Sequence, residues 1–243
     1  MLRPDTQRLW EILQTCPAMR GFVLVGGTAL TLRLGHRISE DLDFMWPAPR
    51  LPEGRVAGLQ RWLDERDISL AANDSAAAIE EFNESGLSLL DYQRNYIAAG
   101  TVKLTLVAPE REVRHFLVPS PDAPLRVATT EEIFRLKCLA CADRSKSRDW
   151  LDLYVMLQRG VTEPIEILRT FESAGVPAKF DIAMMRLCQA MPNAEDEGYE
   201  ALLASPPSLE QMRVYFVAVR DHIEVQAARE RMRGSEGTQE PIR

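Results

Sequence analysis

Two aspartates and a glycine pair stand close together in the stretch FVLVGGTALTLRLGHRISEDLDF, residues 22–44. Asp41 and Asp43 lie two positions apart in DLDFMW, an apolar run typical of a strand. On a strand both carboxylates point to one face, and a two-residue step spans about 6.6 Å. Like charges so placed repel unless a cation lies between them, and Mg²⁺ prefers such oxygen ligands. The spacing predicts a metal site. A solvated acidic face on an edge strand is the alternative, and it fits poorly with so apolar a run.

The glycine pair stands where a predicted strand, FVLV, meets a predicted helix, TALTLRLG. Gly26 and Gly27 would let the backbone approach a ligand closely, and the N–H groups at the start of a helix bind anions such as phosphate. Thr28 adds a hydroxyl there. The phosphate-loop and dinucleotide signatures are both missing, so an ordinary tight turn explains the glycines equally well. Combined with the aspartate pair, the turn indicates nucleotidyl transfer, a reaction in which metal ions stabilise the attacking and leaving oxygens.

A second charged group lies in KCLACADRSKSRDWLD. Lys137, Cys141 and Arg144 are spaced to share one helix face. The serines at positions 145 and 147 would then interrupt the helix and cap a new one, with Asp149 and Asp152 in its first turn. An intrahelical lattice of solvated ion pairs is the alternative to a functional group.

The predicted elements that would position both groups change character along the chain. Helices are expected over 5–15, 28–35 and 54–66, and strands over 21–25, 41–46, 86–92 and 101–107. From about 129 onward the pattern is helical, with breaks near Gly160, Pro177, Pro192 and Pro206. This order predicts an α+β fold in which a mixed sheet with helices is followed by a helical C-terminal region. We expect an α/β domain over 1–125, a helical domain over 126–232 and a disordered tail over 233–243.

Composition and charge argue against several classes of protein. The chain has 243 residues, a formal charge of −7 and a pI of about 5.2, which argues against general nucleic-acid binding. No signal peptide and no membrane-spanning run is predicted, so a cytoplasmic protein with reduced thiols is expected. Cys138 and Cys141 have no second pair and apolar neighbours, and we interpret them as buried small hydrophobic residues.

Taken in order, the two motifs resemble those of the AbiEii/AbiGii toxin family, nucleotidyltransferase-fold proteins of bacterial toxin–antitoxin and abortive-infection systems. The first match comprises the Gly-Gly-Thr-Ala run, Gly35-His36-Arg37, Ser39 and Asp-Leu-Asp-Phe. The second comprises Lys137, Arg144, Arg148, Asp149 and Asp152. The resemblance covers roughly residues 20–155, and the region after 160 does not contribute to it.

The resemblance implies an Mg²⁺-dependent transfer of a nucleoside monophosphate from a nucleoside triphosphate to an acceptor such as a tRNA 3′ end, and a cognate antitoxin as partner. It implies that the triphosphate is held by Gly26, Gly27 and Thr28, with Arg37 and Ser39 also in the nucleotide site. It assigns Asp41 and Asp43 to the metal and to catalysis. Lys137 would neutralise phosphate charge or help to activate the acceptor, and Asp149 would be needed for activity. Asp152 would orient Arg37 or Arg148.

One feature departs from the pattern. Nucleotidyltransferase folds commonly carry a third metal-site acid on a later strand, whereas the strand TVKLTLV offers only Lys103 and Thr105 on its polar face. Asp91 and Glu110 are the nearest substitutes. A nucleotide- or RNA-binding module that has lost turnover, or acts through a partner, therefore stays open as an alternative, as does transfer to a protein or small-molecule acceptor.

Overall fold

The computed structural model of the chain describes residues 1–236. These fall into two compact units, Met1–Leu136 and Lys137–Arg243, and the division lies inside helix α6 (Thr130–Asp143). Most of the tail predicted over 233–243 lies outside the described residues, and α10 continues to Glu236. No helix within residues 1–236 combines the length and apolarity needed to cross a bilayer.

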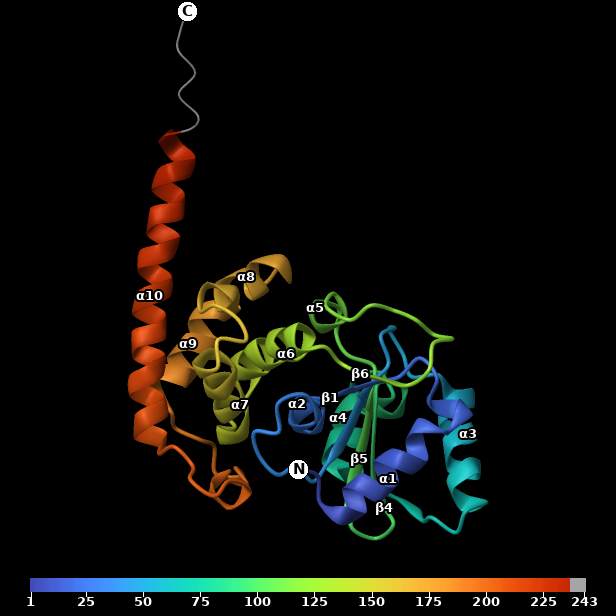
Figure 1. Ribbon diagram of the computed structural model, residues 1–243. Coiled ribbons are helices and arrows are strands. Elements are labelled where there is room, and N and C mark those ends of the chain that lie inside the picture. The colour runs from blue at the N-terminus through green and yellow to red at the C-terminus, as the bar shows by residue number, and fades with distance from the viewer. Residues whose placement is uncertain (237–243) are drawn as a thin grey trace, which may run out of the picture. The chain divides into compact units, whose positions relative to one another are not determined.

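The first unit is built on a mixed six-stranded sheet with the order β3-β4-β5-β2-β1-β6 (Figure 1). Its strands are β1 (Val23–Val25), β2 (Leu42–Met45), β3 (Leu70–Ala72), β4 (Gln93–Ala98), β5 (Val102–Val107) and β6 (Arg126–Val127). Its helices are α1 (Pro4–Gln14), α2 (Gly26–Leu34), α3 (Glu53–Asp64), α4 (Ala76–Glu84) and α5 (Arg111–Arg114), besides the part of α6 that belongs to this unit. In Figure 1, α1 and α3 lie on one face of the sheet and α2 on the other.

The middle of this sheet is fixed by the alternation of side chains along β2. Leu42 and Phe44 are fully buried, and the Phe44 ring stacks on Trp10 of α1 at a centroid distance of 6.4 Å. Asp43 alternates with them and is only half-buried. Strand β2 runs parallel to β5 and antiparallel to β1, so Asp43 lies beside Thr105 on one side and Val25 on the other.

Helix α2 follows β1 without a connecting loop and ends at a left-handed glycine. Gly35 has a φ of 58°, and its N–H donates to the Thr31 carbonyl. Because a residue with a Cβ is strained there, glycine is the expected stop. The next segment, residues 36–41, leads directly back into β2. The strand, helix and strand predicted around the first motif are therefore confirmed.

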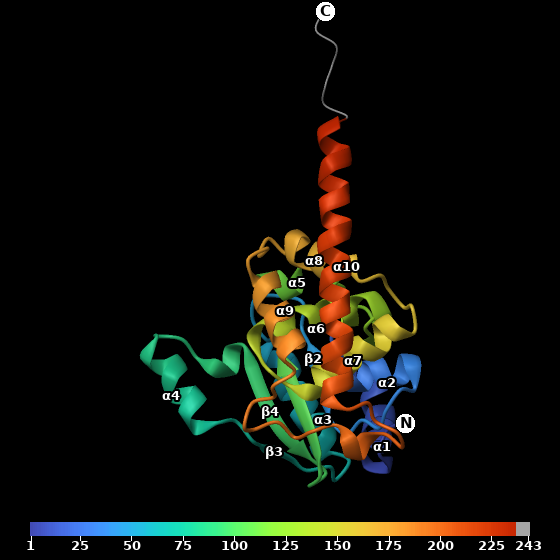
Figure 2. The ribbon, with the colours of Figure 1, turned by 90° about the vertical axis from the view of Figure 1, so that its left-hand side faces the viewer.

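One predicted strand is wrong. Residues 86–92 contain the 3₁₀ turn η2 (Leu89–Asp91), and the strand begins only at Gln93. Leu89 is buried while Leu87 and Leu90 are exposed, so the leucines here do not alternate as they would on a strand. Helix α4, which precedes this segment and extends beyond the sheet edge in Figure 2, and the edge strand β3 were not predicted.

The second unit is helical, as predicted. Besides the end of α6 it contains α7 (Ser147–Gln158), α8 (Ile165–Ser173), α9 (Lys179–Gln189), the 3₁₀ turn η3 (Glu200–Leu202) and α10 (Leu209–Glu236). The helices end close to the predicted glycine and proline breaks. Buried residues of α10 repeat every three or four positions, which gives one face to pack on the other helices; they are Met212, Phe216, Val219 and Ile223. In Figures 1 and 2 the later turns of α10 extend past α8 and α9.

Candidate active site

The two aspartates of the first motif lie at the start of β2. Asp43 belongs to the strand and Asp41 immediately precedes it, and both side chains are half-buried beside the fully buried Leu42 and Phe44. The predicted alternation is therefore present. The two aspartates thus alternate with buried apolar residues at the start of a central strand.

The glycine pair is explained by contacts with the same motif. Gly26 has a φ of 70°, and a Cβ on it would lie 2.7 Å from Asp43 Oδ2. A Cβ on Gly27 would overlap Nη2 of Arg37. A tight turn alone would not require glycine at both positions. Here the first glycine makes room for a candidate metal ligand, and the second makes room for a guanidinium group.

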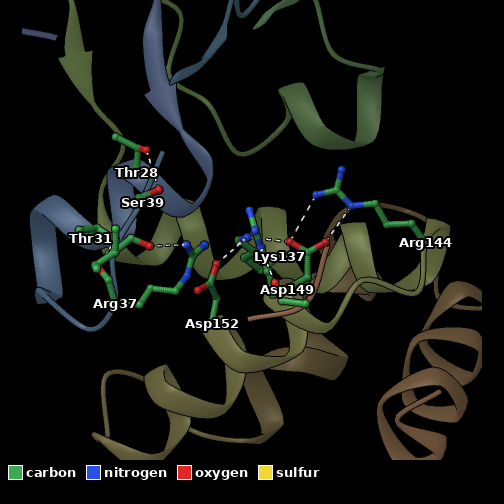
Figure 3. Close-up of polar contacts among 11 residues, drawn as sticks. Thr28, Thr31, Arg37, Ser39, Lys137, Arg144, Asp149 and Asp152 are labelled. Carbon is green, nitrogen blue, oxygen red and sulfur yellow. Dashed lines mark hydrogen bonds and ion pairs between the residues drawn. The ribbon is translucent and has the colours of Figure 1, made fainter. Parts of the chain in front are cut away.

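Thr28 and Ser39 link the start of α2 to the segment that carries Asp41 (Figure 3). The Thr28 hydroxyl donates to the backbone carbonyl of Asp41 and lies 2.8 Å from Ser39 Oγ. Thr28 and Ser39 are 1% and 4% exposed. Thr28 therefore positions the backbone of Asp41, and Ser39 contacts Thr28. The contacts with a triphosphate that the sequence predicts for both residues stay a prediction.

The second motif forms a buried group of charges within the second unit (Figure 3). Lys137 Nζ lies 2.6 Å from Asp149 Oδ1 and 2.7 Å from Asp152 Oδ2. Arg144 Nε donates to Asp149 Oδ2 at 2.7 Å. The lysine comes from α6 and both aspartates come from α7, so the pairs connect two helices. Lys137 is 6% exposed and Asp152 is fully buried, which excludes a solvated intrahelical lattice, whereas the Arg144 side chain is 51% exposed and lies at the edge of the group.

The charges around Asp149 determine its protonation state. Burial alone would raise the pKa of this carboxyl, but the nearby charges of Lys137 and Arg144 and their hydrogen bonds outweigh burial and lower the pKa below its ordinary value of 3.8. Asp149 is thus held as a carboxylate, and its negative charge in turn favours the protonated form of Lys137.

The N-terminus of α7 depends on a residue that sequence analysis missed. Ser147 was expected to cap this helix, but its own N–H donates to Asp196 Oδ1 at 3.1 Å and its hydroxyl donates to Oδ2 at 2.5 Å. Arg148 donates to the Gly198 carbonyl at 2.7 Å and pairs with Glu197 at 3.0 Å. The loop around 196–198 therefore anchors the turn that carries Asp149. No local sequence signal indicates this, because the partners are 49 and 50 residues apart.

Comparison with known proteins decides the family. The model of the family described as nucleotidyl transferase AbiEii toxin, type IV toxin–antitoxin system, matches residues 8–226. The chain belongs to the AbiEii family.

Two further proteins are similar to this chain. The protein aq_aa25 of Aquifex aeolicus (strain VF5) is 25% identical over 228 residues, which cover 92% of this AbiEii-family chain and 98% of the relative. The nucleotidyltransferase toxin MenT4, Rv2826c, of Mycobacterium tuberculosis H37Rv has 13% identity and a TM-score of 0.54, with 88% of this chain and 82% of MenT4 covered. The structural likeness shows that the fold is that of a nucleotidyltransferase.

The candidate metal site of this AbiEii-family chain comprises two carboxylates, Asp41 and Asp43. Within residues 1–236 no three His, Cys, Asp or Glu side chains group together as a metal site. Asp91 lies in η2 and pairs with Arg50 at 3.5 Å, and Glu110 precedes α5 beyond the end of β5. Thr105 occupies the position beside Asp43 on β5. The pair still fits Mg²⁺, since its donors are hard oxygens, Gly26 leaves space at Asp43 Oδ2, and Mg²⁺ usually keeps several waters.

The cysteines of the second motif are structural, as predicted. Cys138 and Cys141 are fully buried in α6. Burial, together with the negative charge of Asp149, raises the pKa of the Cys141 thiol well above its ordinary value of 9.0. Such a thiol stays protonated at neutral pH and is a poor nucleophile or metal ligand.

Proposed function

We propose that this AbiEii-family protein is an Mg²⁺-dependent nucleotidyltransferase that transfers a nucleoside monophosphate from a nucleoside triphosphate to an acceptor and releases pyrophosphate. An RNA such as the 3′ end of tRNA is the proposed acceptor class, and a cognate antitoxin is the proposed protein partner. Family membership and the nucleotidyltransferase fold support the reaction class.

One observation carries the proposal. The glycine turn and the aspartate pair are 14 or more positions apart in the sequence, yet Asp43 Oδ2 occupies the space that a side chain on Gly26 would fill. This brings the Asp43 carboxylate to the N-terminal end of α2. Helix N-termini favour anions, so a phosphate group and its metal ion have complementary charges at this place.

The residues of the first unit would act mainly by positioning. When bound, Mg²⁺ would supply positive charge to the phosphate oxygens. Asp41 and Asp43 would hold that ion, and the first N–H groups of α2 would orient the triphosphate. Thr28 and Ser39 would keep Asp41 in place, and Arg37, which packs against Gly27, would add positive charge near the helix start. Positioning and charge neutralisation are the main requirements of phosphoryl transfer.

Lys137 and Asp149 remain proposed catalytic residues on the strength of the family resemblance. Lys137 lies 2.6 Å from Asp149 and lowers the pKa of that carboxyl, so Asp149 is held as a carboxylate. The role that we propose for Lys137 is to neutralise phosphate charge or to help activate the acceptor.

The test is a labelling assay with a matched charge control. The purified chain is incubated with Mg²⁺, total tRNA and each α-labelled nucleoside triphosphate in turn, beside the variants D41N/D43N and D64N/D67N. Asp64 and Asp67 are exposed acids of the same unit, and Asp67 has a φ of 55°, which asparagine tolerates. We expect label on RNA with the wild-type chain and D64N/D67N, and none with D41N/D43N.

Two outcomes would change the conclusion. Binding of a nucleoside triphosphate without transfer to any acceptor would favour the alternative, a nucleotide- or RNA-binding module, which the lack of a three-acid group in residues 1–236 makes worth testing. Transfer that survives in D41N/D43N would overturn the assignment of the metal ligands.

A further inference from the structure

The segment 37–41 is held by its backbone carbonyls, although it is neither a helix nor part of the sheet. Each of its five carbonyl oxygens accepts a hydrogen bond. Arg37 O accepts from Thr31 Oγ1 at 3.2 Å, Ile38 O from Arg37 Nη1 at 3.0 Å, Ser39 O from Arg3 N at 3.2 Å, Glu40 O from Thr6 Oγ1 at 2.7 Å, and Asp41 O from Thr28 Oγ1. Because every carbonyl of this irregular segment accepts a hydrogen bond, its backbone is held more firmly than that of an ordinary loop.

Two of these donors come from outside both sequence motifs. Thr6 lies in the first turn of α1 and is 2% exposed. Arg3 immediately precedes α1, and its side chain also pairs with Glu40. Leu2 forms a parallel bridge with Ser39. Residues 2–6 therefore run along the segment, which also accepts hydrogen bonds from Thr28 and Thr31 of α2.

The positions of Thr6 and Thr28 matter because of which peptide groups they hold. The Glu40 carbonyl belongs to the peptide plane that precedes Asp41, and the Asp41 carbonyl belongs to the plane that follows it. A peptide group is rigid, so its carbonyl direction sets the orientation of the whole plane. With both planes fixed, φ and ψ of Asp41 are fixed, and with them the direction in which its carboxylate leaves the backbone.

We propose that Thr6 is a positioning residue for the candidate active site. Together with Thr28 it clamps the peptide planes on both sides of Asp41 and so holds the Asp41 carboxylate beside Asp43 for a divalent cation. This inference rests on the proposed metal site. It adds a residue of α1, 34 positions before its hydrogen-bond partner, to the parts that build the site.

The experiment compares Thr6→Val with two other variants. Valine has nearly the shape of threonine and lacks the hydroxyl. Thr6→Ser keeps the hydroxyl. Thr170→Val is the matched control, because Thr170 is also 2% exposed and donates to a backbone carbonyl, Glu166 O, at the same 2.7 Å, but in α8. Each chain is titrated with Mn²⁺, followed by the electron paramagnetic resonance of the free ion, and amide hydrogen exchange is measured over residues 38–43.

We expect Thr6→Val to bind Mn²⁺ about tenfold more weakly, which is the size of effect expected when a buried carbonyl loses its hydrogen-bond donor. We also expect the backbone amides of residues 38–43 to exchange faster in this variant. Thr6→Ser is expected to resemble the wild type in both. Thr170→Val is expected to lower the melting temperature as much as Thr6→Val and to leave Mn²⁺ binding unchanged.

The outcomes separate this inference from the proposed function. A wild-type chain that fails to bind Mn²⁺ would overturn the metal site itself. If the wild type binds Mn²⁺ and Thr6→Val shows the same Mn²⁺ affinity and the same amide exchange rates, only the role of Thr6 would be overturned. A loss of Mn²⁺ affinity in Thr6→Ser as large as in Thr6→Val, or an equal loss in Thr170→Val, would assign the effect to packing and likewise overturn that role.

Discussion

The two aspartate pairs of this protein are stabilised in opposite ways. Asp149 and Asp152 are 2% and 0% exposed, and charged side chains, Lys137 and Arg144, hold them. Asp41 and Asp43 are half-buried, and the segment leading to them is held through its backbone carbonyls, chiefly by neutral hydroxyl groups.

This difference indicates what each pair can do. Taking a carboxylate out of water is costly, and the buried pair meets this cost with cations from its own unit. The half-buried pair keeps contact with water, and three of the five groups that hold the segment before it are hydroxyls. It is therefore suited to receive a cation from solution, whereas the buried pair is suited to keep Lys137 charged and in place.

The largest expected effect comes from removing the buried cation. Lys137→Ala leaves two aspartates in a buried site without their shared partner, which we expect to lower the free energy of unfolding by about 3–5 kcal/mol, measured by urea denaturation. The control is Lys179→Ala, since the pair of Lys179 with Asp143 is exposed and worth at most about 1 kcal/mol.

The same variant should also lose nucleotide transfer, because Lys137 is a proposed catalytic residue. The burial of Lys137 predicts that a loss of stability accompanies the loss of transfer. By contrast, D41N/D43N keeps the shape of two half-buried side chains and is expected to lower the free energy of unfolding by less than Lys137→Ala does. Equal destabilisation of both variants would remove the distinction between the two pairs.

A second prediction concerns the space beside Asp43. Gly26→Ala places a Cβ 2.7 Å from Asp43 Oδ2 on a backbone with a φ of 70°. The left-handed conformation costs about 1–2 kcal/mol for a residue with a Cβ. Displacing the carboxylate should also reduce nucleotide transfer about 100-fold, the effect of a shift of about 1 Å.

The control variant Gly86→Ala separates the effect of backbone strain from the effect of displacing the Asp43 carboxylate. Gly86 has a φ of 75°, and nothing lies within 4 Å of the Cβ it would gain. Both variants should lose similar stability in thermal melts, but only Gly26→Ala should lose transfer and Mn²⁺ affinity. Full transfer by Gly26→Ala would show that Asp43 does not need this space.

Local sequence patterns predicted the features whose residues are close together in the sequence. The alternation of Asp41 and Asp43 with apolar residues, the glycine stop at Gly35 and the second helical unit followed from periods of two and 3.6 residues. The false strand over 86–92 shows the limit, because a leucine-rich run was assigned to a strand although its leucines do not alternate in burial. Residues such as Thr6 and Asp196 escaped prediction, because their partners are 34 and 49 positions away and a single threonine or aspartate has no spacing to interpret.

A smaller effect is expected in acid. The pKa of Asp149 is lower in the folded chain than its ordinary value of 3.8, so its ion pairs contribute stability above that pH, and this contribution is lost as pH falls through 3.8 and below. The free energy of unfolding of the wild type, measured by urea denaturation at several pH values below about 5, should therefore fall more steeply than that of Asp149→Asn. Parallel curves would contradict the assigned pKa shift.

The smallest effect tests whether the buried charge group is closed to water. Cys141 lies on α6 between Lys137 and the helix end and is fully buried, whereas Cys188 is half-buried. A thiol reagent at pH 8 should react first with Cys188, and Cys188→Ser should remove this fast phase. Burial raises the pKa of both thiols, but it raises that of Cys141 further and also keeps the reagent from it. A fast phase that persists in Cys188→Ser and maps to Cys141 would show that water reaches the group. Asp149 and Asp152 would then resemble Asp41 and Asp43 in their access to solution, and the contrast between the two pairs would rest on their partners alone.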